Sequence, residues 1–188
     1  YLKKHLNRNF IISDDLHGAL VKSELVMFCV GTPSRDSGEV DLGPLIRVIN
    51  TVLLVIKDDK FRVICVKSTV PPSTTQNDIA GLLRKSGREP GIDIGLVNNP
   101  EFLREGSGLM DFFAPSRIIV GSASERALAV LRNIYEPLLQ GKTVVDVPWL
   151  DSDQEIPYVE TDVVSAQLTK YAANAFLATR ISFINEIA

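Results

Sequence analysis

Short, continuous apolar runs separated by helical segments constrain the fold of this chain more than any other feature. Turn residues bound these runs, which cover 25–31, 62–67, 94–98, 117–121 and 143–147. Runs of this kind are typical of strands that are buried on both faces. Apolar residues recur at helical spacing over 42–57, 76–86 and 125–139. Strands that alternate with helices predict an α/β fold, in which a doubly wound parallel sheet carries helices on both faces.

Composition excludes several classes of partner. The 188 residues hold 20 Lys and Arg against 23 Asp and Glu, a net charge of -3. No basic block is present that could neutralise a run of phosphates, so we expect no nucleic-acid partner. The apolar runs are shorter than the roughly 20 residues of a membrane-spanning helix, and Tyr1 begins no signal peptide. Cys29 and Cys65 lie inside apolar runs, so we expect buried, reduced thiols and a cytoplasmic protein.

A polar stretch at 148–160 divides the chain into two parts. We interpret it as a boundary loop, after which Thr161 or Asp162 can cap a helix that runs without Gly or Pro to Ala188. This long helix has no C-cap, so we expect it to lead into a second domain. The first domain would then cover residues 1–160, and the helix would occupy 161–188.

The first domain lacks the glycine-rich turn with which a Rossmann-like sheet opens. In such sheets a Gly-x-Gly-x-x-Gly turn and the following helix hold the pyrophosphate of a dinucleotide. No such turn occurs in this sequence. Either the domain binds no dinucleotide, or the first βαβ half of an incomplete Rossmann-like sheet precedes Tyr1.

Small and hydroxyl-bearing residues follow two consecutive strands of the predicted sheet. Gly31, Thr32, Pro33 and Ser34 follow the first run, and the segment 68–74 follows the second. Ligands of open α/β sheets bind beyond the carboxyl ends of the strands, so we expect Thr32 and Thr69 to face one crevice. Taken singly, either segment is an ordinary turn.

Two further pairs of polar residues have the spacing of catalytic groups. Glu101 and Glu105 follow the third strand four residues apart, where they can share a helix face and serve as general acid or base. A solvated helix start explains them equally well. Lys170 and Asn174 lie one turn apart on the last helix, whose other residues are small or apolar. We expect this helix to be buried, with its polar stripe lining a cavity and donating hydrogen bonds to an oxyanion.

Four blocks of sequence, in this order, resemble the UDP-glucose/GDP-mannose dehydrogenase family. They are Val-Gly-Thr-Pro-Ser at 30–34, Lys-Ser-Thr-Val-Pro-Pro at 67–72, Asn-Pro-Glu-Phe-Leu-Arg-Glu-Gly at 99–106 and Lys-Tyr-Ala-Ala-Asn-Ala-Phe at 170–176. Pro-Ser-Arg-Ile-Ile-Val-Gly at 115–121 and Ile-Asn-Glu at 184–186 add to the similarity. The resemblance covers essentially the whole chain, and 99–106 is its most specific block.

The resemblance implies oxidation of the primary alcohol of a nucleotide sugar to a carboxylate, with two hydrides passing in turn to NAD. In this family a cysteine thiolate holds the aldehyde as a thiohemiacetal, and the later thioester is hydrolysed. Glu101 would be the general acid/base of hydrolysis, and Thr69 would help to place the water. Lys170 and Asn174 would stabilise oxyanions at the reacting carbon.

The resemblance also implies the binding residues. The residues expected at NAD are Thr32, Pro33, Ser34, Ser68, Thr69, Val70 and Glu105. The residues expected at the sugar are Glu101, Phe102, Leu103, Glu105, Lys170 and Asn174. No metal site is expected, and a homodimer or larger oligomer is implied.

The sequence departs from the family pattern in several places. The glycine-rich turn and the acidic ribose-binding residue would precede Tyr1, and the nucleophilic cysteine would follow Ala188, so we expect this chain alone to be inactive. Ser73 stands where Gly is usual, which can narrow the approach of the loop to ligand. Gln167 stands where Glu is usual, which removes a charge near Lys170.

Three other interpretations remain open. A GDP-mannose dehydrogenase is one, although 104–106 and 115–121 look more like the UDP-glucose branch. A β-hydroxyacid dehydrogenase also carries Lys and Asn four apart on an interdomain helix, but it forms no thioester and needs no second carboxylate motif such as 99–106. A non-catalytic nucleotide-binding or dimerisation module is the third, and intact Thr69, Glu101, Lys170 and Asn174 oppose it.

Overall fold

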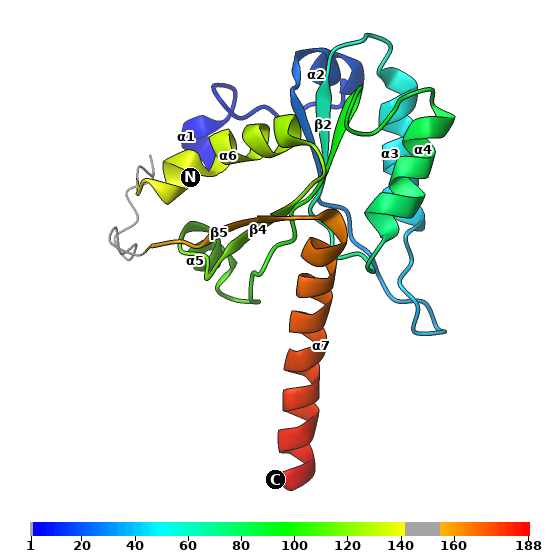
Figure 1. The fold of residues 1–188 in the computed structure, drawn as a ribbon. Helices are drawn as coiled ribbons and strands as arrows, with labels where there is room; N and C mark the ends of the chain where they lie inside the picture. Colours follow the sequence, from blue (N-terminus) through cyan, green and yellow to red (C-terminus); the bar gives the residue numbers. More distant parts are fainter. Residues whose placement is uncertain (1, 142–154) are drawn as a thin grey trace.

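The computed structural model describes residues 2–141 and 155–188, and these form one five-stranded sheet with flanking helices. The strands lie side by side in chain order (Figure 1). They are β1 (Leu25–Phe28), β2 (Arg62–Val66), β3 (Ile94–Asn98), β4 (Ile118–Gly121) and β5 (Tyr158–Thr161). Strands β1, β2 and β3 pair in parallel. The predicted α/β class is confirmed.

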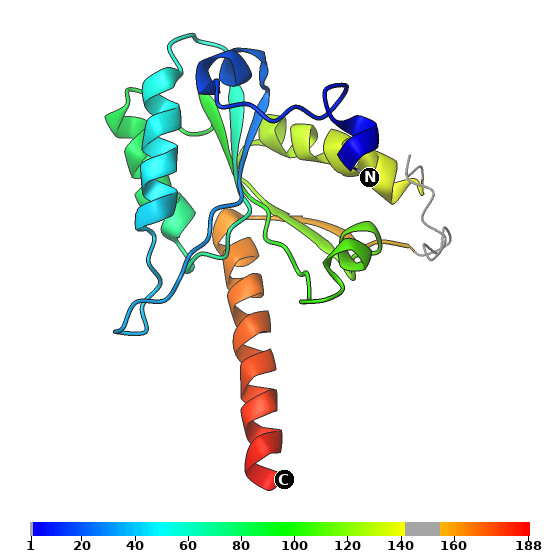
Figure 2. The ribbon, with the colours of Figure 1, turned by 180° about the vertical axis from the view of Figure 1, so that it is seen from behind.

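Helices cover both faces of the sheet, as predicted. Helices α3 and α4 lie against one face and α6 against the other (Figures 1 and 2). The elements are α1 (Leu2–His5), α2 (Leu16–Lys22), α3 (Gly43–Val55), the π-helix η1 (Thr75–Ile79), α4 (Ala80–Lys85), α5 (Gly108–Phe113), α6 (Glu125–Leu139) and α7 (Val163–Ile187). Helices α1, α2 and α5 were not predicted, because four to seven residues are too few to establish a helical period.

Alternate residues of β2 supply two separate apolar clusters. Ile64 and Val66 face α3 and α4, whereas Val63 and Cys65 face α6. All five residues of β2 are buried, which is why residues 63–66 of this strand form an unbroken apolar run in the sequence.

The junction between β3 and β4 contradicts the prediction of a wholly parallel sheet. The two strands are antiparallel and pair only at Asn98 and Gly121. Residues 99–117 contain one six-residue helix, α5, in place of a crossover helix that would return the chain to the other end of the sheet. As a result β4 and β5 extend beyond the carboxyl end of β3 (Figure 1).

Two predictions around the proposed boundary have different outcomes. The strand predicted at 143–147 lies outside the described residues. The loop predicted at 148–160 is wrong in its last residues, because Tyr158–Thr161 form β5, parallel to β4. This strand has no apolar run to reveal it. Its Glu160 accepts two hydrogen bonds from the guanidinium of Arg132 on α6, and this pairing holds a charged residue in the sheet.

The two cysteines have different surroundings. Cys65 is buried in β2, and burial raises the pKa of its thiol to about 12. The prediction is wrong for Cys29, which is exposed because β1 ends at Phe28 and the chain then leaves the sheet.

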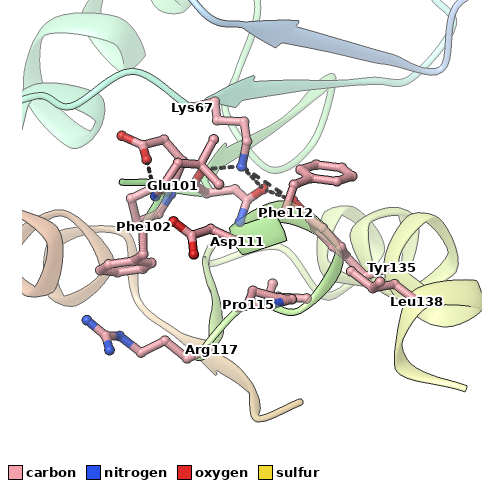
Figure 3. Close-up of a pocket in the computed structure, with 13 residues that line it drawn as sticks. Lys67, Glu101, Phe102, Asp111, Phe112, Pro115, Arg117, Tyr135 and Leu138 are labelled. Atoms are coloured by element: carbon pink, nitrogen blue, oxygen red, sulfur yellow. Dashed lines mark hydrogen bonds between the residues drawn. The ribbon is translucent and has the colours of Figure 1, made fainter. Parts of the chain in front are cut away.

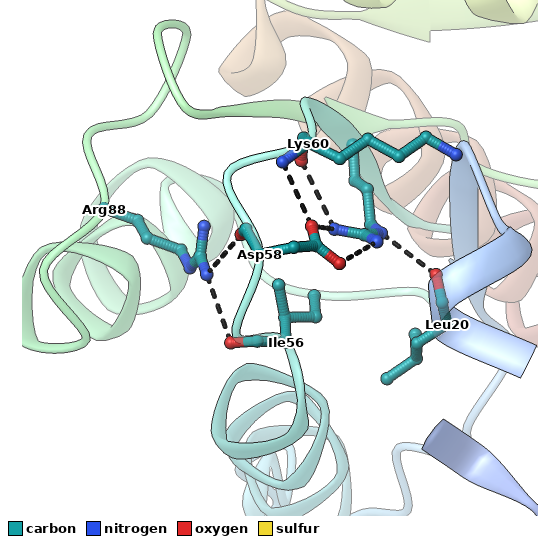
Figure 4. A network of polar contacts seen from close by, with 6 residues as sticks. Leu20, Ile56, Asp58, Lys60 and Arg88 are labelled. Atoms are coloured by element: carbon teal, nitrogen blue, oxygen red, sulfur yellow. Dashed lines mark hydrogen bonds and ion pairs between the residues drawn. The ribbon is translucent and has the colours of Figure 1, made fainter. Parts of the chain in front are cut away.

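A network of polar contacts joins the loop before β2 to helix α2 and to Arg88 (Figure 4). Arg62 begins β2, is 1% exposed, and donates to the carboxylate of Asp58 and to the carbonyl of Leu20. The guanidinium lowers the pKa of Asp58 to about 2. Arg88 donates to the carbonyls of Ile56 and Asp58 at 3.1 Å each. The charge of the buried Arg62 guanidinium is therefore paired with the Asp58 carboxylate, as its burial requires.

Helix α7 begins against the sheet and then leaves it. The carboxylate of Asp162 caps the helix by accepting from the backbone N–H of Ser165 at 2.9 Å, as predicted. Within α7 only Ala166, Gln167 and Lys170 are buried. The prediction of a buried helix is wrong beyond Lys170, because no other element of the described residues packs on this part of α7 (Figure 1). Among the described residues, no helix is long and apolar enough to span a membrane.

Gly121 sets how closely α7 approaches β4. A Cβ at this position would come within 2.6 Å of both the Ala166 Cβ and the Asp162 carbonyl oxygen. We expect Gly121→Ala to lower the free energy of unfolding by about 1–3 kcal/mol, because backbone atoms of α7 would have to move. Gly81→Ala is the matched control, since it adds a methyl to open space in α4 and favours the helix. Equal effects of the two changes in denaturant unfolding would contradict this account.

Ser73 adopts a backbone conformation that favours glycine. Its φ is 73°, in the left-handed region that costs a non-glycine residue about 1–2 kcal/mol. This explains why Gly is usual here in the family that the sequence resembles. We expect Ser73→Gly to raise the free energy of unfolding by up to about 1 kcal/mol, after the entropy of the added glycine is subtracted. Ser73→Ala keeps the strain, so a gain of the same size with Ala would refute the explanation.

Candidate active site

The loops after β1 and β2 meet at the carboxyl edge of the sheet. The Thr32 hydroxyl donates to the carbonyl of Thr69 at 2.8 Å. The Ser68 hydroxyl donates to the carbonyl of Val30 at 2.6 Å, which ties the same two loops together. The predicted convergence of Thr32 and Thr69 is confirmed. It arises because both residues follow adjacent parallel strands.

The other residues predicted in these loops occupy different environments. Pro33 and Ser34 are exposed, and Ser34 bridges to Val40 where the loop folds back. Val70 is buried in the core behind the site. A Cβ on Gly31 would find no atom of the described chain within 4 Å, so a ligand can closely approach the backbone there.

An ion pair joins the loop after β3 to helix α7. The Lys170 ammonium lies 3.1 Å from one carboxylate oxygen of Glu101, and the other oxygen accepts from the backbone N–H of Leu103 at 2.6 Å. Lys170 is only 6% exposed. Its ammonium also lies 5.4 Å from the ring centre of Phe102, which carries the guanidinium of Arg117 at 4.1 Å. Lysine and carboxylate are therefore held in a fixed relation.

Asn174 borders a depression that also reaches the two threonines. The depression measures about 430 Å³ and is lined by Thr32, Val40, Thr69, Tyr171, Asn174 and Ala175. One turn of α7 thus separates the Lys170–Glu101 pair from a space between α7 and the carboxyl edge of the sheet. Of the predicted polar stripe, Asn174 lines this depression, whereas Lys170 is buried beside Glu101 and does not line it.

Glu105 does not join this arrangement. Residues 101–107 form a loop and a turn in place of the helix expected from the spacing, so Glu101 and Glu105 share no helix face. The turn is held by Asp111, which accepts from the Arg104 guanidinium and backbone and from the Ser107 hydroxyl. Glu105 is exposed, and among the described residues it has no hydrogen bond or ion pair to Thr32, Thr69 or Glu101.

A smaller cavity of about 40 Å³ lies behind the Glu101 loop (Figure 3). Polar and charged residues line part of it, and apolar residues such as Phe112 and Leu138 complete the wall. The polar and charged residues are Lys67, Asn99, Glu101, Asp111, Arg117 and Tyr135. Neither Lys67 nor Tyr135 was singled out from the sequence. The feature of the sequence that could have identified Lys67 is its position directly at the end of an apolar run. Tyr135 lies far along the chain, so only the fold brings it here.

Comparisons with known proteins agree with this geometry. Residues 1–139 match the NAD binding domain of the UDP-glucose/GDP-mannose dehydrogenase family, and residues 164–188 match the central domain of the same family. The chain belongs to the UDP-glucose/GDP-mannose dehydrogenase family. Its described sheet is therefore part of an NAD-binding domain, and the depression lined by Thr32 and Thr69 lies at the carboxyl edge of that sheet.

Individual relatives are similar along the whole chain. A UDP-glucose 6-dehydrogenase of Rickettsia felis is 40% identical over 189 residues, which is 100% of this chain and 38% of the relative. The solved UDP-glucose dehydrogenase of Pyrobaculum islandicum is 31% identical, with a TM-score of 0.79 over 98% of this chain and 38% of that structure. The chain thus spans somewhat more than a third of such relatives.

A second solved relative is named for the other substrate in the family name, GDP-mannose. The GDP-mannose dehydrogenase of Pseudomonas aeruginosa is 28% identical, with a TM-score of 0.79 over 93% of this chain and 37% of that structure. The fold is therefore equally close to members of both branches, and the backbone alone does not choose between their substrates.

Proposed function

We propose that the full-length protein oxidises a nucleotide sugar with NAD, converting UDP-glucose to UDP-glucuronate by two successive hydride transfers. The observation that carries this proposal is the Glu101–Lys170 pair, held beside a depression that Thr69 and Asn174 share. The names of relatives about 40% identical to the chain support the choice of substrate.

Each residue has a role that its surroundings permit. NAD, when bound, accepts the hydrides. Lys170 and Asn174 donate hydrogen bonds to the oxyanion that develops at the reacting carbon. Glu101 accepts a proton from the water that hydrolyses the thioester, and the adjacent Lys170 ammonium holds its carboxylate in place. Thr69 helps to place that water.

The binding roles remain those that the resemblance implies. Thr32, Pro33 and Ser34 border NAD, and Ser68, Thr69 and Val70 lie near its nicotinamide, where Ser68 and Val70 act through their backbone. Phe102 and Leu103 line the sugar site. Glu105 reaches NAD only if the turn at 105–107 is rearranged from its present form.

Stoichiometry of NADH formation tests the proposal. Purified full-length protein should form two NADH for each UDP-glucose consumed, and GDP-mannose should be a poorer substrate. A β-hydroxyacid dehydrogenase would form one NADH for each hydroxyacid and none with UDP-glucose. A non-catalytic module would form none with any of these compounds, and either outcome would overturn the proposal.

We propose that the full-length protein is a homodimer or larger. Helix α7 exposes Ile181, Phe183, Ile184 and Ile187, each at least 55% exposed. Apolar side chains gathered on one helix require a covering surface. Light scattering at micromolar concentration should give at least twice the monomer mass, and a monomer would contradict the proposal.

The remaining proposals concern organisation and location. Residues 1–160 form the rest of the NAD-binding domain, and the helix from 161 leads into a domain for dimerisation and substrate binding. The central-domain match from residue 164 supports this division. A cytoplasmic location, with reduced thiols, is proposed from the isolated positions of Cys29 and Cys65.

A further inference from the structure

Lys67 is a partly buried cation that the proposed chemistry does not use. It follows β2, and its ammonium lies 3.4 Å from the Asn99 carbonyl, 3.3 Å from the Asn99 side-chain oxygen and 3.5 Å from the Tyr135 hydroxyl. Among the described residues it forms no ion pair. Burial lowers the pKa of Lys67. An ammonium that is largely removed from water and has only neutral partners destabilises the fold, and such groups cluster at functional sites.

Asn99 is the point at which this network reaches the site. Its side-chain N–H donates to the carbonyl of Ile119 at 2.8 Å, and its backbone N–H donates to the carbonyl of Val66 at 2.9 Å. Its side-chain oxygen accepts from both Tyr135 and Lys67. Asn99 is 1% exposed and lies two residues before Glu101. Strands β2 and β4 and helix α6 therefore all fix the start of the Glu101 loop through this one residue.

The charge of Lys67 also acts on Glu101. The two residues line the same cavity (Figure 3), and the Glu101 carboxylate is among the groups that stabilise the ammonium of Lys67. The charged groups facing Glu101 are thus Lys170 from α7 and Lys67 from the end of β2. Arg117 is stacked on Phe102, and Arg104 is paired with Asp111. Burial lowers the pKa of Lys67 and the Lys170 charge adds to this effect, whereas the Glu101 carboxylate opposes it.

We propose that Lys67 is a positioning residue for Glu101: its ammonium holds Asn99, and with it the start of the loop that carries the Glu101 carboxylate. Lys170 touches Glu101 directly, whereas Lys67 acts through Asn99. This inference rests on the proposed function, since it concerns the step in which Glu101 accepts a proton.

The test is Lys67→Met in the full-length protein. We expect the initial NADH burst and the KM for UDP-glucose to be kept, and steady-state turnover to fall about 10- to 100-fold. Thermal stability should change little, because losing the hydrogen bonds of the ammonium is offset by removing a partly buried charge that has no carboxylate partner.

Three further variants separate charge from position. Lys67→Gln removes the charge but keeps a donor for Asn99, so steady-state turnover should recover toward the wild type, and it serves if Lys67→Met fails to fold. Lys67→Arg keeps both the charge and a donor and should also recover turnover. Tyr135→Phe removes a hydrogen bond to Asn99 without changing charge, so steady-state turnover should fall while the burst is kept.

Unchanged steady-state turnover in Lys67→Met, or no recovery of turnover in Lys67→Gln and Lys67→Arg, would overturn the inference about Lys67. Its failure is distinct from failure of the proposed function. If the wild type formed no second NADH from UDP-glucose, or Glu101→Gln turned over normally, the hydrolysis step itself would be wrongly assigned, whatever the Lys67 variants did.

Discussion

Glu101→Gln in the full-length protein is expected to give a burst of NADH followed by little turnover. The amide cannot accept a proton from water, so oxidation can proceed to the thioester but hydrolysis cannot. An acyl-enzyme should then accumulate. Pre-steady-state absorbance of NADH measures the burst, and mass spectrometry of the quenched protein detects the adduct.

A control variant is needed to show that the loss of a carboxylate charge elsewhere on the protein does not give the same result. Glu136→Gln makes the same change at an exposed position on α6 and should leave both burst and turnover unaltered. Glu101→Gln keeps a polar side chain opposite Lys170, so the loop should stay in place. Normal turnover of Glu101→Gln would mean that Glu101 is a structural carboxylate, and the central assignment would be wrong.

The sequence was most informative where burial is complete. Strands β2 and β3 are buried at every residue, so their apolar runs predicted them almost to the residue. Strand β5 was missed because Arg132 neutralises its Glu160 from α6, a contact that depends on the fold. The reversal at β4 was missed because pairing direction depends on where residues 99–117 lie, and local patterns do not record this.

Physical reasons explain which parts of the site could be predicted from the sequence and which could not. The contact between Thr32 and Thr69 could be predicted from the sequence, because adjacent parallel strands end at the same edge of the sheet. The four-residue spacing of Glu101 and Glu105 was misleading because their segment is not helical. The pairing of Glu101 with Lys170 joins residues far apart in sequence, and no spacing rule predicts it. The resemblance named both residues but gave no contact between them.

The ion pair explains why a second substitution should fail at an earlier step than Glu101→Gln. Lys170 is buried and fixed between Glu101 and the Phe102 ring, so its ammonium is already oriented when an oxyanion develops. Preorganised donors of this kind are worth about 10²- to 10³-fold in rate when one is removed. Lys170→Ala should therefore slow turnover by about 10²-fold or more.

In Lys170→Ala the burst of NADH should itself be slow, because the lost donor serves the redox steps and no acyl-enzyme builds up before hydrolysis. Stopped-flow absorbance separates this result from the fast burst and trapped adduct of Glu101→Gln. Lys85→Ala, on the exposed last turn of α4, removes the same charge and should change neither phase. A fast burst in Lys170→Ala, followed by an accumulated adduct, would place Lys170 with Glu101 in hydrolysis and would remove it from the hydride-transfer steps.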